Sequence, residues 1–158
     1  MKIKSSKGFS LIELVIVIGI LFILGEIAVL QFIKYKGNAN LKEAVRAISG
    51  DIQLCRQMAV SENTHYRIVI NVTNNEYTIQ KETSPSTWVD VFPVKSVGRD
   101  YGDIKIVGNP TFGADKIIFQ PRGTINAGTL EIQHTKLLSK ARIVTSLMGR
   151  VRIQYELR

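Results

Sequence analysis

The side chains that most often carry out chemistry are few in this chain and widely separated. His65 and His134 are the only histidines and Cys55 is the only cysteine, without the spacing of a metal site. Asp100 and Asp103 together supply too few oxygens for Ca²⁺, which prefers about six to eight. No phosphate-binding loop, Gly-x-Ser-x-Gly elbow or Cys-x-x-Cys pair is present. We therefore expect no enzyme, no cofactor and no metal, with both histidines at the surface or a strand edge and Cys55 buried.

Glu13 is the most unusual charged residue in the sequence, because its carboxylate lies in a long apolar run. From Phe9 to Ile33 the only ionisable side chains are Glu13 and Glu26. As a helix this run would be about 37 Å long, enough for a hydrocarbon core of roughly 30 Å. A carboxylate at the centre of a membrane helix costs about 2.5–3.5 kcal/mol, and less toward the ends. An amino terminus created by cutting after Gly8 in a neighbouring copy would supply a counter-charge.

The junction Lys7-Gly8-Phe9-Ser10-Leu11-Ile12-Glu13-Leu14 resembles the type III signal of type IV pilins and type II secretion pseudopilins. This resemblance implies that a prepilin peptidase removes the leader, residues 1–8, after Gly8. It also implies that the new N-terminal residue, Phe9, is N-methylated and that Glu13 serves subunit docking. The alternative is an uncleaved single-pass anchor in which Glu13 is incidental. The leader lysines favour a cytoplasmic N-terminus under either interpretation.

A second group of candidate residues is basic and lies near the C-terminus. Arg150 and Arg152 are two residues apart at the exit of a predicted hairpin, so a regular strand would place them on one face. Lys140, Arg142 and Arg122 are candidates to lie nearby. Such a patch can neutralise phosphates, and guanidinium groups suit bidentate phosphate contacts. The alternatives are a solvated strand face and a contact to neighbouring subunits.

Two helical segments precede these basic residues. The run at residues 9–33 is the predicted transmembrane and assembly helix. Residues 34–64 read as an amphipathic helix, with a weak point near Gly37 and a second at Gly50. Its apolar stripe, at steps of three and four residues, consists of Leu41, Ala44, Val45, Ile48, Ile52, Cys55 and Ala59.

After residue 64 the hydrophobic pattern changes to period two, and no segment has the periodicity of a full-length helix. Turn residues separate the segments, and the turn at residues 73–76 makes the first two a hairpin. Strands are predicted at residues 66–72, 77–81, 89–91, 104–107, 116–119, 129–133, 141–145 and 151–157. The predicted fold class is α+β, with a long N-terminal helix followed by an antiparallel β-sheet or sandwich at residues 65–158.

The C-terminal part resembles the head of the GspH/FimT group of minor pilins and pseudopilins. The similar text is Ile118-Phe119-Gln120-Pro121-Arg122-Gly123-Thr124, then Gly128-Thr129-Leu130-Glu131-Ile132, and the final hairpin from Arg142 to Ile153. In FimT-type minor pilins the segment that matches Gly149-Arg150-Val151-Arg152 is associated with DNA capture, although secretion-type relatives carry similar text. Residues 82–115 are not diagnostic.

Together these resemblances imply a minor pseudopilin of a type II secretion system. Its partners would be prepilin peptidase, other pilin or pseudopilin subunits and the bacterial inner membrane, with the β-rich region in the periplasm and in a filament after assembly. The alternative is a FimT-like minor type IV pilin that binds DNA for natural transformation.

Overall fold

The computed structural model describes residues 10–108 and 110–158. Helix α1 (Leu11–Ser61) is the longest element, and it contributes to two compact units. The first unit ends at Lys36. The second unit, named the head from here on, runs from Gly37 to Arg158.

In the first unit, α1 is mostly apolar up to Ile33, and the side chains whose burial the structure describes there are exposed. Its most apolar 18-residue window has a mean hydropathy of 2.7, and none of that window is buried. Leu11, Ile16 and Phe22 are among the exposed side chains. A helix that is apolar all round is stable inside a membrane or a protein core, not in water. By length and composition, α1 is the one helix among the described residues that could cross a membrane.

In the head, α1 continues to Ser61 and presents the predicted apolar stripe to the core. All seven stripe residues are buried, and none has more than 2% of its surface exposed. The helix then ends where the sequence changes to Glu62-Asn63-Thr64, with Asn63 at a positive φ of 49°. The seven stripe residues therefore share the buried face of α1.

Among the residues that the structure describes, nine strands follow α1 in two antiparallel sheets, and this confirms the predicted fold class. The first sheet has the order β3-β2-β1-β6, and β4 also pairs with β2. Its strands alternate between buried and less buried residues, because one face covers the core. The bounds are β1 (Tyr66–Asn71), β2 (Glu76–Ser84), β3 (Thr87–Asp90), β4 (Lys95–Ser96) and β6 (Lys116–Phe119).

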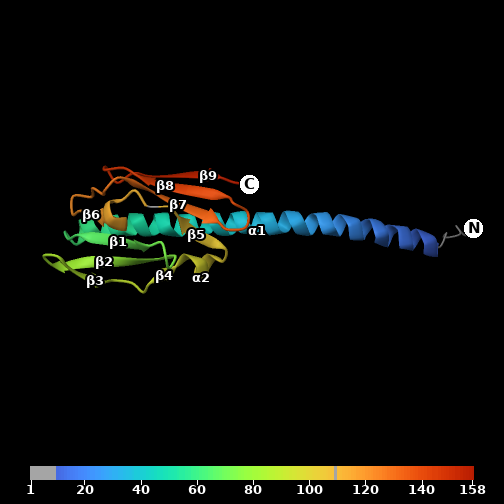
Figure 1. Ribbon diagram of the computed structural model, residues 1–158, viewed down its shortest axis with the longest axis horizontal. Helices are drawn as coiled ribbons and strands as arrows, with labels where there is room; N and C mark the ends of the chain where they lie inside the picture. Colours follow the sequence, from blue (N-terminus) through green and yellow to red (C-terminus); the bar gives the residue numbers. More distant parts are fainter. Residues whose placement is uncertain (1–9, 109) are drawn as a thin grey trace, which may run out of the picture. The chain divides into compact units, whose positions relative to one another are not determined.

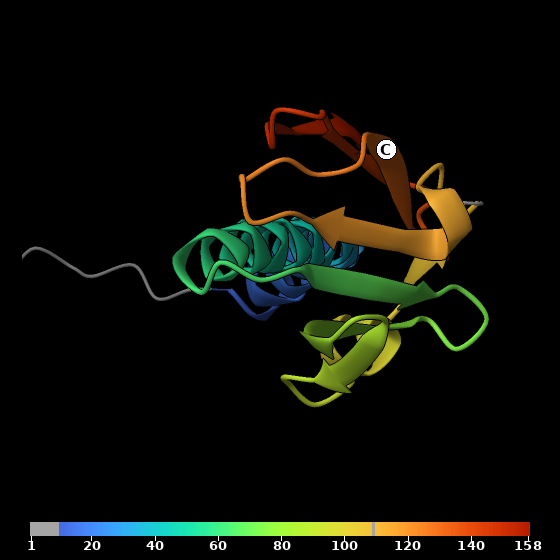
Figure 2. The same cartoon turned by 90° about the vertical axis from the view of Figure 1, so that its left-hand side faces the viewer.

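The second sheet has the order β5-β7-β8-β9. Its inner face carries the buried residues Ile104, Ile132 and Ile143. Within the head, the two sheets lie on two different sides of α1 (Figures 1 and 2), so that the helix stripe forms part of the core under both. The bounds are β5 (Ile104–Val107), β7 (Gly128–His134), β8 (Lys140–Thr145) and β9 (Val151–Glu156).

A buried carboxylate fastens α1 to the first sheet. Asp51 is 8% exposed and accepts a hydrogen bond from the Tyr77 hydroxyl at 2.6 Å. Its two oxygens also lie 2.7 and 2.8 Å from Lys95 Nζ. A buried charge is tolerated when it is paired and hydrogen-bonded in this way. Burial and the bond to Asp51 both raise the pKa of Tyr77, so its phenol stays protonated as the donor.

The structure differs from the sequence prediction in several short elements. Turn residues were expected from Gly98 to Gly102, but residues 97–101 form the one-turn helix α2 (Val97–Tyr101). The short helix η1 (Gly113–Asp115) precedes β6. The two-residue strand β4 was not predicted, because two residues carry no periodicity. β2 continues to Ser84, beyond its predicted end at residue 81, because β3 folds back onto it.

Gly37 was expected to weaken α1, but the helix continues through it and the residue is buried. A Cβ added there would lie 2.5 Å from Leu137 Cδ1 and 2.7 Å from His134 Nε2. The turn between β7 and β8 therefore rests directly on the helix backbone. Gly50, by contrast, has no atom within 4 Å of such a Cβ.

Gly37 and Gly50 allow the cost of overpacking to be compared with the gain in helix propensity, because only Gly37 is in close contact with other residues. We expect Gly50→Ala to stabilise the protein by about 0.5–1 kcal/mol, because alanine is the better helix former. Gly37→Ala gains the same propensity but must displace Leu137 and His134, and overpacking costs about 1–3 kcal/mol. Urea unfolding of the full-length chain in detergent should show opposite shifts in midpoint. A stabilising Gly37→Ala would show that the turn does not rest on Gly37.

Candidate functional site

The predicted N-terminal site is only partly within the described residues. Gly8 and Phe9, the predicted cleavage and methylation positions, lie outside them. Glu13 lies in the first turn of α1 and is exposed, with its backbone N–H 3.1 Å from the Ser10 carbonyl oxygen. Within residues 10–108 and 110–158, no cation lies at ion-pair distance from Glu13. Its charge is thus uncompensated in the described part of a single copy.

The C-terminal candidates, Arg150 and Arg152, follow the turn of the β8–β9 hairpin. Gly149 allows this turn, because its φ is +76° and a Cβ there would clash with the Arg56 guanidinium. The Ser146 N–H donates to the Arg150 carbonyl oxygen at 3.0 Å and closes the hairpin. From there the chain enters β9 in regular register, so Arg150 and Arg152 lie on the outer face of the second sheet.

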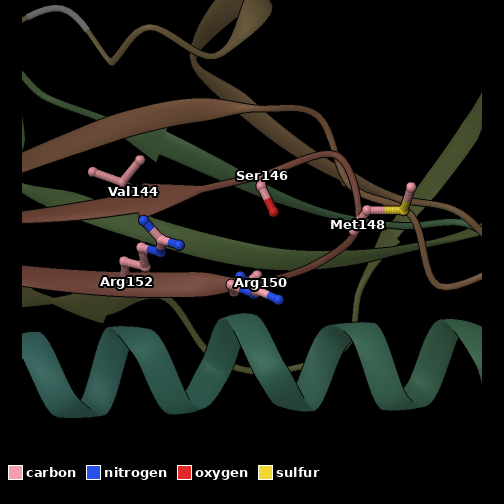
Figure 3. Close-up of a pocket in the computed structure, with 5 residues that line it drawn as sticks. All are labelled: Val144, Ser146, Met148, Arg150 and Arg152. Carbon is pink, nitrogen blue, oxygen red and sulfur yellow. The ribbon is translucent and has the colours of Figure 1, made fainter.

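Together with three other residues, the two arginines line a hollow of about 430 Å³. Figure 3 shows Arg152 beside Val144, its partner across the β8–β9 ladder, and Arg150 near Ser146, with Met148 at the turn. Both arginines are exposed, and neither has a carboxylate at ion-pair distance in the part of the chain that the structure describes. The hollow can hold an anionic group against the guanidinium groups and an apolar group against Val144 and Met148.

Lys140 and Arg142 lie on the same outer face, but acidic neighbours already hold them. Glu131 on β7 bonds Lys140 Nζ at 2.9 Å and Arg142 Nε at 3.1 Å. Glu156 on β9 lies 3.5 Å from Arg142 Nη1. The bond from Lys140, followed by that from Arg142, lowers the pKa of Glu131, and Glu131 in turn raises the pKa of Arg142. These two cations are therefore less available to a ligand than Arg150 and Arg152.

Arg122 does not line the Arg150–Arg152 hollow. It lies in the turn after β6, beside a second hollow of about 440 Å³ at the C-terminal end of α1. Arg56, which also lines that hollow, donates from Nε to the Gly123 carbonyl oxygen at 2.8 Å. Arg56 and Met148 were not singled out from the sequence. Met148 lies in the turn between β8 and β9, where strand alternation does not apply, and Arg56 lies far away in the sequence, so local spacing did not reveal either residue.

The remaining reactive side chains have structural roles. His65 is exposed and pairs with Glu82 at 2.9 Å. His134, expected at the surface or a strand edge, is instead 6% exposed at the end of β7, where its Nδ1 accepts the backbone N–H groups of Lys136 and Leu137. The expectation failed because the turn folds the ring onto α1 at Gly37.

Cys55 is buried as predicted, and burial raises the pKa of its thiol to about 12. Across the described ranges, no three His, Cys, Asp or Glu side chains gather where a metal ion could bind. Asp103 instead pairs with Lys136 at 2.8 Å, which lowers the pKa of Asp103.

Comparison with known proteins connects both parts of the chain to one group. Residues 44–149 match the family of the type II transport protein GspH, and residues 3–25 match the prokaryotic N-terminal methylation motif. No curated protein sequence is significantly similar to the chain.

Two solved structures share the fold. The minor pseudopilin EpsH of the Vibrio cholerae type II secretion system is 13% identical with a TM-score of 0.60, over 73% of this chain and 97% of that one. The Pseudomonas aeruginosa type IV minor pilin FimU is 16% identical with a TM-score of 0.53, over 76% of this chain and 92% of that one. At these identities, the likeness concerns the fold. The match of the family model over most of the head, joined to the methylation motif, shows that this chain belongs to the GspH family of minor pseudopilins and minor type IV pilins.

Proposed function

We propose that the chain is a minor pseudopilin of a type II secretion system. A prepilin peptidase would remove residues 1–8, and the mature subunit would enter a periplasmic pseudopilus for protein export. The family match, the methylation motif and the fold shared with EpsH support this assignment. The subunit would have a structural role in the filament. This role agrees with the family and with the structural roles of the reactive side chains described above.

The single observation that carries the proposal is the environment of Glu13. Its side chain is exposed on a helix whose other faces are apolar, so a membrane would surround it with hydrocarbon. Cutting after Gly8 would place a free amino group at Phe9, four residues before Glu13. In a filament of parallel helices, the Phe9 amino group of one copy would neutralise the carboxylate of the next.

The proposed organisation follows from this assembly. Residues 1–8 would be the leader and residues 9–33 the transmembrane and assembly helix, with the inner membrane around it before assembly. Residues 34–64 would be the amphipathic helix and residues 65–158 the β-rich periplasmic region. The compact head begins at Gly37, so the amphipathic helix and the β-rich region would act as one folded unit.

Glu13→Gln should leave the protein in the membrane but reduce its recovery in assembled filaments about tenfold or more. A hydrogen bond to a charged group is worth about 1.5–3 kcal/mol, and the neutral amide loses the charge-assisted part. Glu26→Gln removes the other acid of the apolar run and is the matched control. Membrane fractionation and quantitative recovery of sheared filaments measure the two properties separately.

Mass spectrometry of the mature protein tests the cleavage step directly. We expect an N-terminal Phe9 that carries one additional methyl group. An intact Met1 would contradict the proposal, as would equal recovery of Glu13→Gln and wild type in filaments.

A second candidate function, DNA binding by a minor type IV pilin, is favoured by the hollow beside β9. Arg150 and Arg152 line it without an acidic partner in the described structure, whereas Lys140 pairs with Glu131 and Arg142 pairs with both Glu131 and Glu156. Two free guanidinium groups on one face suit successive phosphates of a nucleic-acid backbone. DNA uptake would then replace protein export as the role of the filament.

DNA binding can be tested with a 20-base-pair duplex and the full-length chain in detergent over a range of salt concentrations. Replacing both Arg150 and Arg152 by Gln should reduce the slope of log affinity against log salt by about 2, because each phosphate contact contributes about 1. Glu131→Gln should increase affinity, because it releases Lys140 and Arg142. Arg46→Gln with Arg99→Gln is the charge-matched control. No binding by the wild type at low salt would exclude this function.

A further inference from the structure

Each sheet has an outer strand at either end, and the edges of two of these strands, β5 and β6, are closed by asparagine side chains. Asn75 Nδ2 donates to the Ile104 carbonyl oxygen at 2.8 Å, and Asn75 Oδ1 accepts the Ile106 N–H at 2.8 Å, so its amide replaces a neighbouring peptide group beside β5. Asn126 does the same for β6. It donates to the Lys116 carbonyl oxygen and accepts the Ile118 N–H, both at 2.7 Å.

A third edge, β3, is protected by other means. The strand has four residues, its pairing with β2 is interrupted by a bulge, and Pro93 follows shortly after its end. Short strands, bulges and proline are common devices against unwanted pairing at a sheet edge. Three of the four sheet edges therefore carry a feature that blocks the addition of another strand.

The fourth edge, β9, has none of these features. It has six residues without proline or glycine, and its register with β8 is unbroken from Val151 to Glu156. The Arg150 carbonyl oxygen bonds to Ser146 on the β8 side, so by alternation the N–H and C=O groups of Val151, Ile153 and Tyr155 point away from β8. Over the described residues, no hydrogen bond occupies this row.

The side chains along β9 define the chemistry of a strand that could pair there. On the outer face, Arg150 and Arg152 have no carboxylate at ion-pair distance within the described structure. On the inner face, Val151 and Ile153 are partly buried against the core, and Tyr155 is 38% exposed. A strand added antiparallel would place side chains close to Arg150 and Arg152 at non-hydrogen-bonded positions, where Cα atoms are about 4.5 Å apart. Acidic side chains fit these positions, and apolar ones fit the positions between them.

A second copy of this chain does not fit the edge if both copies are held in one membrane. β9 runs antiparallel to α1, because Gly149 lies against Arg56 whereas the Arg158 carbonyl oxygen accepts from Asn38 Nδ2 at 3.3 Å. Antiparallel pairing of two β9 strands would therefore put the two Gly37 residues, where the chain enters each head, at opposite ends of the joined sheet. Parallel pairing of two β9 strands through this edge would turn one head over relative to the other. Arg150 and Arg152 of one copy would then lie on the same side as the apolar inner face of the other copy.

We propose that the free edge of β9 binds an extended segment of a different subunit of the same filament by β-strand addition, with acidic side chains facing Arg150 and Arg152 and apolar side chains between them. The exclusion of a second copy rests on the proposed membrane anchoring. Strand addition uses main-chain hydrogen bonds for affinity and alternate side chains for specificity. Arg150 and Arg152 would thus contact a protein partner. Binding of nucleic acid at this edge would instead contradict the proposal.

The test uses a seven-residue peptide of alternating Glu and Val, blocked at both ends, with the full-length chain in detergent. Amide NMR signals of Val151, Ile153 and Tyr155 should shift on titration. Tyr155→Pro removes an N–H from the free edge without removing a bond to β8, and should weaken binding at least tenfold. Tyr155→Ala removes the same ring but keeps the N–H, and should change affinity less than threefold. The same peptide with alternate amides N-methylated should not bind the wild type, which keeps the test valid if Tyr155→Pro unfolds.

Three outcomes would overturn the proposal. Equal binding of the N-methylated peptide would show that no strand is added, and equal binding of a Lys-Val peptide would show that Arg150 and Arg152 do not select acids. In cells, a photo-crosslinker at Gln154, which is exposed on β9, should form an adduct with another subunit of the filament. An adduct with a second copy or with DNA would contradict it. The peptide measurements require neither Glu13 nor a filament, so their failure is separate from failure of the proposed assembly.

Discussion

The head depends on one surface, the apolar stripe that α1 presents between Leu41 and Ala59. Each of the two sheets must cover one face, and the helix lies under both, so the stripe supplies part of the core for each. Fully burying a side chain such as Leu41 or Ile52 contributes about 1.5–3 kcal/mol. Ala44, Cys55 and Ala59 are small and fully buried, so they leave room for close approach of the sheets.

Periodicity in the sequence predicted this surface and most strands, because steps of three, four and two residues directly reflect which side is buried. Asp51 and Arg56 fall outside this apolar stripe, yet both make contacts that local spacing does not indicate. Asp51 bonds to residues 26 and 44 positions away, and Arg56 to one 67 positions away. A polar residue next to an apolar stripe can be buried if a distant partner compensates it, and local spacing does not reveal such partners.

The basic C-terminal residues also show that local spacing does not reveal partners on other strands. Alternation correctly predicted that Arg150 and Arg152 share a face, since that follows from one strand alone. Whether a cation is free depends on register across strands. Glu131 lies opposite Arg142 in the β7–β8 ladder and thus neutralises it, whereas Val144 lies opposite Arg152 and cannot. For Gly8, Phe9 and Glu13 the opposite holds, because their motif is local and the sequence alone carries the prediction.

Three features of the described residues differ in the partner that would complete them in the proposed filament. The apolar side chains of α1 up to Lys36 need hydrocarbon or other helices, Glu13 needs a cation in that same environment, and the edge of β9 needs a peptide backbone. Water satisfies the last of these well and the first poorly, so their order in assembly is constrained. In the proposed filament, the apolar helix would be covered first. Glu13 would gain a counter-charge once helices lie side by side, and strand pairing at β9 would become effective when neighbouring heads are already held close. A subunit built in this way is poorly suited to act alone, which is the physical reason to expect a filament.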